Sequence, residues 1–377
     1  MSARVQACMR NDARQNRGLL EKGLYLLSGF YEAGVRLRSK GFENGIFREH
    51  RLPCRVISVG NLTVGGSGKT PMTMYLAQTL KDSGYSPAVL SRGYKGKMEK
   101  AGGVVSDGTN ILMGPDQAGD EPFMMAACLP HIPFLVGADR YTAARKAIAR
   151  FTPDVIILDD GFQHRRLHRD LDFVLVDATV GFGNGFLLPR GILREPLEAL
   201  ARADAIVMTR SDPTDIAFDA KIAKAVPHIP IFRSANRPFL YGVVKAGEEM
   251  PIDAAAGLDP YDFGSFQNKR ILGFSGIARN TEFRRMVTDV SKELVDFFEF
   301  PDHYGYSGAD LRRIFKRAEA VSVDCVVTTQ KDYARIQGRI RTPVDLAVIG
   351  IEMDFGSDRE GLTDYINQFL KPMPSAG

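Results

Sequence analysis

Short apolar runs alternate with amphipathic stretches over most of the chain. In its first part, runs that predict buried strands lie at residues 55–59, 87–91, 134–136, 155–158, 173–176 and 205–209. Helical patterns separate several of them, as over residues 71–80 and 140–150, where apolar residues return every three or four positions. Continuous apolar strands that alternate with helices indicate a parallel sheet covered by helices on both faces.

The alternation restarts after about residue 225. Further strands are predicted at residues 270–274, 294–298, 325–329 and 346–349, with helices over residues 281–290 and 309–321. We interpret residues 227–242 as a crossover segment that leads into this smaller α/β domain. A ligand site is expected in the cleft between the two domains.

The helix predicted over residues 18–37 has a broad apolar face. One half of its helical wheel carries Leu19, Leu20, Leu24, Leu26, Leu27, Phe30, Tyr31, Val35 and Leu37. The longest uncharged run, residues 23–31, is far shorter than the roughly 20 apolar residues that a membrane-spanning helix needs. The face is therefore expected either to lie in the interface of a bilayer or to pack on the protein's own core, and the pattern leaves both open.

Composition and charge add to this picture. The 377 residues are 44% hydrophobic and 25% charged, which is typical of a folded globular protein with room for two domains. The net charge of +4 comes from residues 1–51, which contain ten Arg and Lys against five Asp and Glu. This local basic excess suits an anionic bilayer surface. The small total charge predicts no nucleic-acid partner. The four cysteines form no CxxC pair, which predicts neither a disulfide framework nor a structural metal site and fits a reducing cytosolic compartment.

A glycine-rich loop follows the first strand. The segment Gly60-Asn-Leu-Thr-Val-Gly-Gly-Ser-Gly-Lys-Thr70 leads directly into an apolar-periodic helix, which is the context of a P-loop. The residues expected to bind ATP are Thr63, Val64, Gly65, Gly66, Ser67, Gly68, Lys69 and Thr70. Glycines let backbone N–H groups approach phosphate oxygens, and the new helix presents its positive end to them. Lys69 is expected to reach the β- and γ-phosphates and Thr70 to bind Mg²⁺, although the strict pattern has Gly where this chain has Thr63.

A second apolar run ends in Asp159 and Asp160. A carboxylate at the carboxyl end of a strand beside a P-loop holds Mg²⁺, directly or through water. Two adjacent residues of an extended strand cannot both face the metal, so which of them contacts Mg²⁺ stays open. The expected fold is thus an α/β protein with a P-loop NTPase-type parallel sheet. It is divided into a basic amphipathic arm (residues 1–51), a P-loop domain (52–226), which the resemblance described next makes a kinase domain, and a smaller α/β domain that closes the cleft (227–377).

Several motifs together resemble the tetraacyldisaccharide 4′-kinase family. They are the P-loop with Pro71, Ser91-Arg-Gly-Tyr94, Gly119-Asp-Glu-Pro122, Leu158-Asp-Asp-Gly-Phe-Gln-His-Arg165, Leu193-Arg-Glu-Pro196, Pro301-Asp-His-Tyr304 and Thr328-Thr-Gln-Lys-Asp332. The resemblance implies transfer of the γ-phosphoryl group of ATP, with Mg²⁺, to the 4′-hydroxyl of an acylated disaccharide 1-phosphate, giving lipid IVA. It also implies a peripheral enzyme on the cytoplasmic side of the bacterial inner membrane, with no obligate protein partner.

The resemblance assigns an acid–base pair. The family's proposed base falls on Asp120 and its partner on His303, where this chain has Asp-His-Tyr instead of the familiar Asp-His-His. Either a carboxylate orients an imidazole and raises its basicity, or the imidazole tunes a carboxylate that takes the hydroxyl proton. Without the family, the residues alone favour an N-cap of the following apolar helix for Asp120 and a packed surface histidine for His303.

Other residues of the matched motifs are candidates for secondary roles. Glu121 and Glu195 are expected near a second metal ion or its water shell. Donors to nucleotide or substrate phosphates are expected among Gln163, His164, Arg140 and Arg194. These roles follow from the motifs and from the need of phosphoryl transfer for charge neutralisation.

Two functions of other classes stay open as alternatives. A GTPase or metal-insertion chaperone is suggested by the loop, and Thr209-Arg-Ser-Asp212 loosely matches the base-reading motif of GTPases. Val64 argues against the dimeric regulatory ATPases, which have a signature Lys at that position. The other alternative is a noncatalytic peripheral membrane binder, against which the intact Lys69, Thr70 and Asp160 argue.

Overall fold

The computed structural model describes Met9, Ile222 and residues 18–211, 226–248, 263–338 and 341–370. The chain forms two compact units. The first consists of Met1–Leu90, Arg140–Asn236 and Met353–Gly377, and the second of Ser91–Asp139 and Arg237–Glu352. This division differs from the predicted ranges 52–226 and 227–377, because residues 91–139 belong to the second unit and residues 353–377 to the first.

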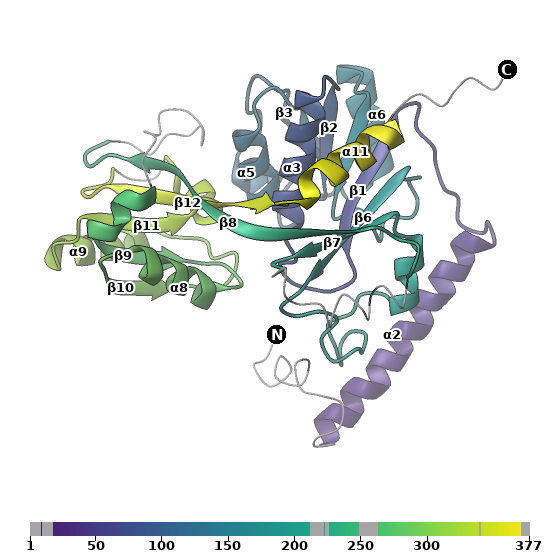
Figure 1. Cartoon of the computed structure of the whole chain (residues 1–377), viewed down its shortest axis with the longest axis horizontal. Coiled ribbons are helices and arrows are strands. Elements are labelled where there is room, and N and C mark those ends of the chain that lie inside the picture. Colours follow the sequence, from purple (N-terminus) through teal and green to yellow (C-terminus); the bar gives the residue numbers. More distant parts are fainter. Residues whose placement is uncertain are drawn as a thin grey trace. The chain divides into compact units, whose positions relative to one another are not determined.

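The first unit contains a parallel sheet (Figure 1). Its strands are β1 (Arg55–Asn61), β2 (Pro87–Ser91), β5 (Val155–Asp159), β6 (Leu171–Asp177), β7 (Ala205–Thr209) and the first part of β8 (Ile231–Val244). They lie in the order β8-β7-β6-β1-β5-β2, and every neighbouring pair is parallel. Strands β2, β5, β6 and β7 are buried along their whole length, as continuous apolar runs predict.

The helices of the first unit include α3, which follows the glycine-rich loop. They are α2 (Leu19–Glu43), α3 (Lys69–Asp82), α6 (Arg140–Phe151), the 3₁₀ helix η1 (Leu197–Arg202) and α11 (Asp358–Leu370). Met72, Leu76 and Leu80 of α3 are fully buried, so this helix is firmly seated on the unit. The loop that α3 follows is thereby held at the carboxyl end of β1, which is where ligands bind in sheets of this kind.

The second unit has a sheet with the order β10-β9-β11-β12-β8. Its strands are β9 (Arg270–Ser275), β10 (Glu293–Glu299), β11 (Cys325–Thr329), β12 (Leu346–Asp354) and the later part of β8. The unit also contains β3 (Gly103–Ser106) and β4 (Phe134–Val136), which pair antiparallel. Its helices are α4 (Pro115–Ala118), α5 (Asp120–Cys128), η2 (Phe263–Asn268), α8 (Asn280–Val290), α9 (Gly308–Ala320) and α10 (Gln330–Ile336). The neighbours among β9, β10, β11 and β12 are parallel.

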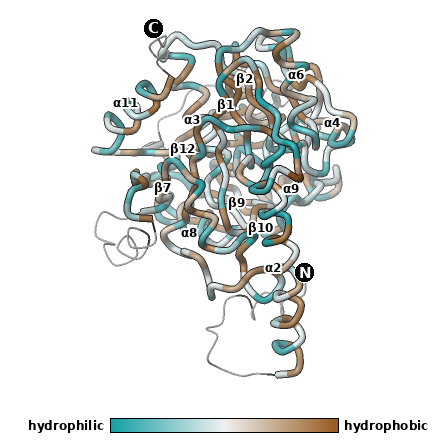
Figure 2. Tube along the Cα trace, turned by 90° about the vertical axis from the view of Figure 1, so that its right-hand side faces the viewer, coloured by the Kyte–Doolittle hydropathy of each residue, from teal (hydrophilic) through white to brown (hydrophobic). Residues whose placement is uncertain are grey.

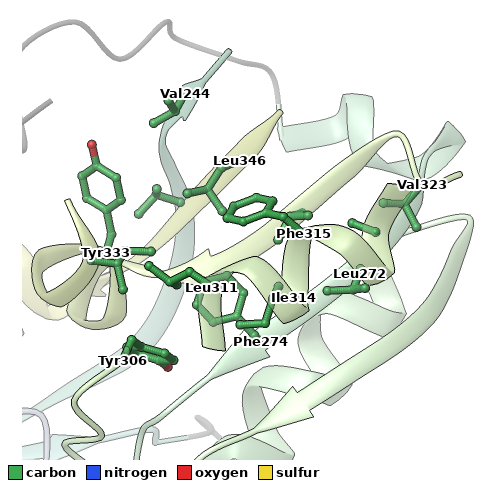
Figure 3. Packing of buried hydrophobic residues seen from close by; sticks show 14 of the residues in the cluster. Val244, Leu272, Phe274, Tyr306, Leu311, Ile314, Phe315, Val323, Tyr333 and Leu346 are labelled. Atoms are coloured by element: carbon green, nitrogen blue, oxygen red, sulfur yellow. The ribbon is translucent and has the colours of Figure 1, made fainter. Parts of the chain in front are cut away.

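A large core of the second unit lies between this sheet and α9 (Figure 3). Leu311, Ile314 and Phe315 of α9 pack there with Phe274 of β9 and Tyr333 of α10, all of them buried. The apolar residues of α9 recur every three or four positions, which gives one continuous stripe for the sheet to cover. Helix α9 begins at a capping box in which Ser307 and Asp310 satisfy each other's backbone N–H groups.

Most predicted elements are confirmed. Residues 227–242 lead from the first unit into the second, as expected of a crossover segment, because the chain passes from one unit to the other between Asn236 and Arg237. The prediction missed that most of this segment is a strand, β8, which has 14 residues and begins at Ile231. The polar residues Arg233, Ser234, Asn236 and Arg237 and the proline at 238 interrupt its apolar pattern, so the strand signal is weak. The predicted α/β class and the amino-terminal helix are present, and the helix extends to Glu43.

The apolar face of α2 is mostly exposed. Figure 2 shows the many hydrophobic positions along this helix. Among its residues only Leu24, Ser28 and Gly41 are buried. Exposed large apolar side chains of this helix are Leu19, Leu20, Tyr25, Leu26, Leu27, Phe30, Tyr31 and Leu37. The alternative in which this face packs on the protein's own core is therefore wrong for most of the helix. Within the described residues, no helix has the length and apolarity needed to cross a bilayer.

Candidate active site

The glycine-rich loop is held by Asn61, the last residue of β1. The Asn61 side-chain amide donates to the Thr63 carbonyl at 2.7 Å and to the Ser67 hydroxyl at 2.8 Å. Gly65 and Gly68 have φ angles of 117° and 88°, a region that favours glycine. Asn61 was not among the predicted site residues, although it lies inside the loop motif.

The backbone conformation at Thr63 explains why this chain departs from the strict P-loop pattern at that position. Its backbone forms an isolated antiparallel bridge with Leu193, and it is not among the residues with positive φ. An extended backbone suits a β-branched residue, so this position does not require glycine.

Lys69 is the first residue of α3, as the motif requires. Its ammonium group donates to the Asn61 side-chain oxygen at 3.2 Å and lies 3.7 Å from Asp160 Oδ1. Thr70 follows in the first turn and is buried. The start of α3 thus joins backbone N–H groups, a lysine and a hydroxyl, which together suit the phosphates of a nucleotide and a cation bound to them.

The two adjacent aspartates have different surroundings. Asp159 ends β5 and is buried, where it accepts a hydrogen bond from the Thr73 hydroxyl at 3.4 Å. Asp160 has a φ of 53°, a left-handed conformation that aspartate tolerates better than most residues and that ends the strand geometry. Its Oδ1 lies 2.8 Å from Arg194 Nη1. Burial alone would raise the pKa of Asp160, but the charges of Lys69 and Arg194 outweigh it and hold this pKa below its ordinary value.

These oxygen donors fit Mg²⁺ bound together with a nucleotide. In the described part of the chain no three His, Cys, Asp and Glu side chains gather into a metal site of their own. Mg²⁺ in kinases is usually bound by one or two carboxylates, with phosphate oxygens and waters completing its octahedron. Thr70 with Asp159 or Asp160 is a donor set of that kind. Glu121, the fourth predicted metal ligand, lies in the second unit and forms an ion pair with Lys331.

Two predicted phosphate donors lie at the same end of β1. Arg194 Nη1 is 3.3 Å from the Asn61 side-chain oxygen, and the Gln163 side-chain amide donates to the Asn61 carbonyl at 2.9 Å. Arg140 begins α6, is buried, and contributes to the lowered pKa of Asp160. His164 follows Gln163 in the loop after β5.

Glu195 has a different environment from the one expected of it. Its carboxylate pairs with Arg202 at 2.5 Å and is buried. The Arg202 guanidinium also lies over the Phe162 ring, 4.5 Å from its centroid. Glu195 is therefore engaged by a cation of the protein itself.

A small cavity lies beside this group of residues. Its volume is about 210 Å³, and its lining consists of Tyr31, Val35, Arg38 and Ser39 from α2 with Gln163, Arg165, Arg194 and Glu195. Hydrogen bonds from Tyr31 to the Arg194 carbonyl, at 3.0 Å, and from Arg38 to the Gln163 carbonyl, at 3.1 Å, fix α2 along it. Three arginines and an apolar wall make the cavity suitable for an anionic group on an amphiphile.

The carboxyl end of β7 also supports the loop. The Thr209 hydroxyl donates to the Ser67 carbonyl, and Arg210 Nη1 donates to the Gly66 carbonyl, both at 3.0 Å. Arg210 is held in turn by Asp177 at 2.6 Å. Asp212, the residue that would read a base in a GTPase, lies outside the described residues.

Asp120 and His303 meet in the second unit. The His303 Nδ1 atom lies 3.3 Å from Asp120 Oδ2, and the same oxygen accepts a hydrogen bond from Arg335 Nε at 2.7 Å. Burial alone would raise the pKa of Asp120, but the hydrogen bond with His303 and the charge of Arg335 hold it below its ordinary value. The carboxylate is thus ionised and partly exposed, as a group that accepts or steers a proton must be.

The N-cap alternative for Asp120 is wrong. The N-cap of α5 is Gly119, and Asp120 is the first residue of the helix. The ring of His303 contacts Asp120 and meets the ring of Tyr94 edge to face. Sequence reasoning missed Arg335, which follows the matched motif Thr328-Thr-Gln-Lys-Asp332 by three residues.

Comparison with known proteins agrees with these features. A family model described as tetraacyldisaccharide-1-P 4'-kinase matches residues 20–371. The tetraacyldisaccharide 4'-kinase of Syntrophus aciditrophicus (strain SB) is 42% identical over 350 residues, which cover 90% of this chain and 91% of that one. The protein of the same name from Desulfatibacillum aliphaticivorans is 39% identical over 370 residues, 98% of each chain.

A solved structure is also similar to this chain over most of its length. The crystal structure of LpxK from Aquifex aeolicus in complex with ATP has a TM-score of 0.74 and 33% identity, and the match covers 93% of this chain and 100% of that chain. The family model, the relatives and the solved structure all extend over both units. The chain therefore belongs to the tetraacyldisaccharide 4′-kinase family.

Proposed function

We propose that this protein transfers the γ-phosphoryl group of ATP to the 4′-hydroxyl of a tetraacyldisaccharide 1-phosphate, the step of lipid A biosynthesis that gives lipid IVA. The observation that carries the proposal is the family match over residues 20–371, together with an intact loop lysine and the Asp120–His303 pair. The match extends over both units, so it includes the nucleotide residues and the acid–base residues.

The nucleotide is bound by the loop from Thr63 to Thr70. Backbone N–H groups and the start of α3 cradle the phosphates, and Lys69 neutralises charge on the β- and γ-phosphoryl oxygens. Thr70 and one of Asp159 and Asp160 hold Mg²⁺, which supplies further charge neutralisation. Since Asn61 contacts both Lys69 and Arg194, its amide keeps the two cations in place before ATP arrives.

The acceptor hydroxyl loses its proton to the Asp120–His303 pair. An ionised Asp120 beside the imidazole can take the proton itself or raise the basicity of the ring, and both routes need the contact that the two side chains make. A base in this role typically contributes about 10²- to 10⁴-fold to the rate.

The cavity beside α2 binds the anionic headgroup of the lipid. Arg38, Arg165 and Arg194 supply donors for a sugar phosphate, and Tyr31 and Val35 supply an apolar wall. The exposed apolar face of α2 lies in the interface of the inner membrane on its cytoplasmic side, so that the acyl chains stay in the bilayer. The protein is then a peripheral enzyme whose substrate reaches it from the membrane surface.

Phosphate transfer from ATP, with GTP as the comparison, tests this proposal. We expect labelled ATP to phosphorylate the detergent-dispersed lipid only when Mg²⁺ is present, and Lys69→Ala to remove the reaction. Equal use of GTP, or nucleotide hydrolysis that the lipid does not affect, would instead favour the GTPase alternative.

A further inference from the structure

Behind the Asp120–His303 pair, the second unit contains a buried arginine. The side chain of Arg335 is 5% exposed, whereas that of Asp120 is 24% exposed. Its Nε atom donates to Asp120 Oδ2 at 2.7 Å, and its Nη2 atom lies 3.4 Å from His303 Nδ1. One guanidinium therefore contacts both members of the pair from the protein side.

The guanidinium is itself anchored. Nη1 donates to Asp332 Oδ1 at 2.9 Å and to the Gly276 carbonyl at 3.0 Å. The same Gly276 carbonyl accepts the backbone N–H of His303 at 3.2 Å. Arg335 is thus tied to Asp120 by its side chain and to the backbone of His303 through a shared carbonyl.

Asp332 has no exposed surface, and its oxygens are occupied by donors of the protein. Its Oδ1 accepts hydrogen bonds from the Tyr306 hydroxyl at 2.9 Å and from the Gly276 N–H at 3.1 Å, and its Oδ2 accepts one from the Thr329 hydroxyl at 2.6 Å. A buried carboxylate with this many donors is fixed in one orientation. It can therefore fix the arginine that it pairs with.

We propose that Arg335, anchored by Asp332, is a positioning residue that sets the orientation of the Asp120 carboxylate toward the acceptor hydroxyl. The inference rests on the proposed function, because it assigns Arg335 a part in that reaction. The planar fork of the guanidinium makes this possible, since one edge binds Asp332 and Gly276 while Nε binds Asp120.

The arrangement also limits the partners of the histidine ring. Arginine only donates hydrogen bonds, so a ring nitrogen that accepts from Arg335 cannot at the same time donate to Asp120. Because Nδ1 lies within 3.4 Å of both groups, the position of Arg335 decides which of the two contacts forms. Lysine has neither the fork nor the reach to occupy both sites at once.

The test compares Arg335→Lys, Arg335→Gln and Asp332→Asn with the wild type. The control is Arg317→Gln, which removes another Arg–Asp pair of the same unit, formed with Asp296 at 2.8 Å. For each variant kcat, the KM for lipid and the Kd for Mg-ATP are measured, with circular dichroism and thermal unfolding as checks of the fold. Arg335→Gly is assayed with and without added guanidinium chloride at a nondenaturing concentration, with sodium chloride as the salt control.

A positioning role predicts a loss in kcat alone. We expect kcat to fall about 100-fold in Arg335→Gln and about tenfold in Arg335→Lys, because small misplacements of reacting groups cost this much. The Kd for Mg-ATP is expected to change less than about twofold, and guanidinium to restore part of the activity of Arg335→Gly. If Arg335→Gln does not fold, the kcat of Arg335→Lys tests the inference in its place.

Three results overturn the inference. The first is a kcat within twofold of wild type in folded Arg335→Lys and Arg335→Gln. The second is a loss that affects ATP binding and thermal stability as much as kcat, and the third is guanidinium rescue no greater than that by sodium chloride. Failure of the proposed function is a distinct result, since the wild type would then transfer no phosphate to the lipid, or Asp120→Ala would be fully active.

Discussion

The Asn61 side-chain oxygen accepts a hydrogen bond from the ammonium group of Lys69 at 3.2 Å, while the nitrogen of the same amide holds the glycine-rich loop. A single buried amide thus fixes both the loop and its lysine. The consequence is that the phosphate site is preorganised by a residue outside the Gly-Lys-Thr motif itself.

Replacing this amide is expected to weaken nucleotide binding. Asn61→Leu leaves Lys69 without that acceptor and the Ser67 hydroxyl without its donor. The loss of hydrogen bonds to buried or charged groups costs about 1–3 kcal/mol, so the Kd for Mg-ATP should rise by about fivefold to 150-fold. Calorimetric titration with Mg-ATP measures this, and Gln78→Ala, on the exposed side of α3, is the control. An unchanged Kd in Asn61→Leu contradicts the role.

Removing the acid–base pair is expected to affect transfer and not nucleotide binding. Asp120→Ala should abolish phosphoryl transfer, and His303→Ala should lower kcat by about 10²- to 10⁴-fold. Mg-ATP binding should stay nearly unchanged, because the loop and Lys69 are intact. Single-turnover assays and ATP titrations of both variants measure the two effects separately. Full activity in Asp120→Ala would rule out its assignment.

The basic cavity is expected to control the affinity for the lipid. Arg38→Ala and Arg165→Ala each remove a charged donor from its lining, and such hydrogen bonds are worth about 1.5–3 kcal/mol. The KM for the lipid should therefore rise about tenfold or more, with the Kd for Mg-ATP unchanged. Arg145→Ala, an exposed arginine of α6, serves as control. A KM that does not respond in either cavity variant excludes the cavity as the headgroup site.

The exposed face of α2 is expected to bind the bilayer. A triple variant with Leu19, Leu26 and Phe30 each changed to Ser removes side chains that are 90%, 63% and 69% exposed. Each contributes about 1.5–3 kcal/mol when it enters an apolar phase, so cosedimentation with anionic vesicles should fall by orders of magnitude. These substitutions leave Ser28 and Tyr31, which fix α2 to its unit, in place. Ala33→Ser is the matched control, and undiminished vesicle binding by the triple variant argues against an interfacial helix.

The capping box of α9 is expected to make stability depend on pH. Hydrogen bonds from Ser307 hold the pKa of Asp310 below its ordinary value. The stabilisation is therefore complete above the unfolded pKa of about 3.9 and is lost as the pH falls through the lower folded value. Asp310→Ala should lower the free energy of unfolding by about 1 kcal/mol at pH 7 and by much less near pH 3. Urea unfolding at the two pH values measures this, with Lys316→Ala on the same helix as control, and an equal cost at both pH values contradicts it.

Much of the fold could be predicted because its strands are continuous apolar runs. Val155–Asp159 and Ala205–Thr209 are buried throughout, so their pattern is unambiguous. Strand β8 was missed because its middle is polar and contains a proline, and its pairing with β7 depends on contacts that no local pattern records. The return of residues 353–377 to the first unit was also missed, because it too depends on contacts between distant parts of the chain.

From the residues alone, the site could be predicted only where a motif is local, and the pairing of Asp120 with His303 came from the family resemblance. The loop from Thr63 to Thr70 is contiguous, and its chemistry follows from the order of its residues. The contact between Asp120 and Arg335 joins residues 215 positions apart, and nothing in either neighbourhood indicates the other. The different surroundings of Asp159 and Asp160 depend on one left-handed φ angle, which a pair of identical residues does not reveal.

The central claim is the transfer of phosphate to a specific hydroxyl of a membrane lipid. The most direct measurement incubates the protein with ATP labelled at the γ-position, Mg²⁺ and detergent-dispersed tetraacyldisaccharide 1-phosphate, and determines by mass spectrometry and NMR where the new phosphate is attached. We predict one new phosphate on the 4′-oxygen, formed by the wild type and by neither Lys69→Ala nor Asp120→Ala. A product without new phosphate, or label released only as inorganic phosphate at a rate independent of the lipid, would contradict the account.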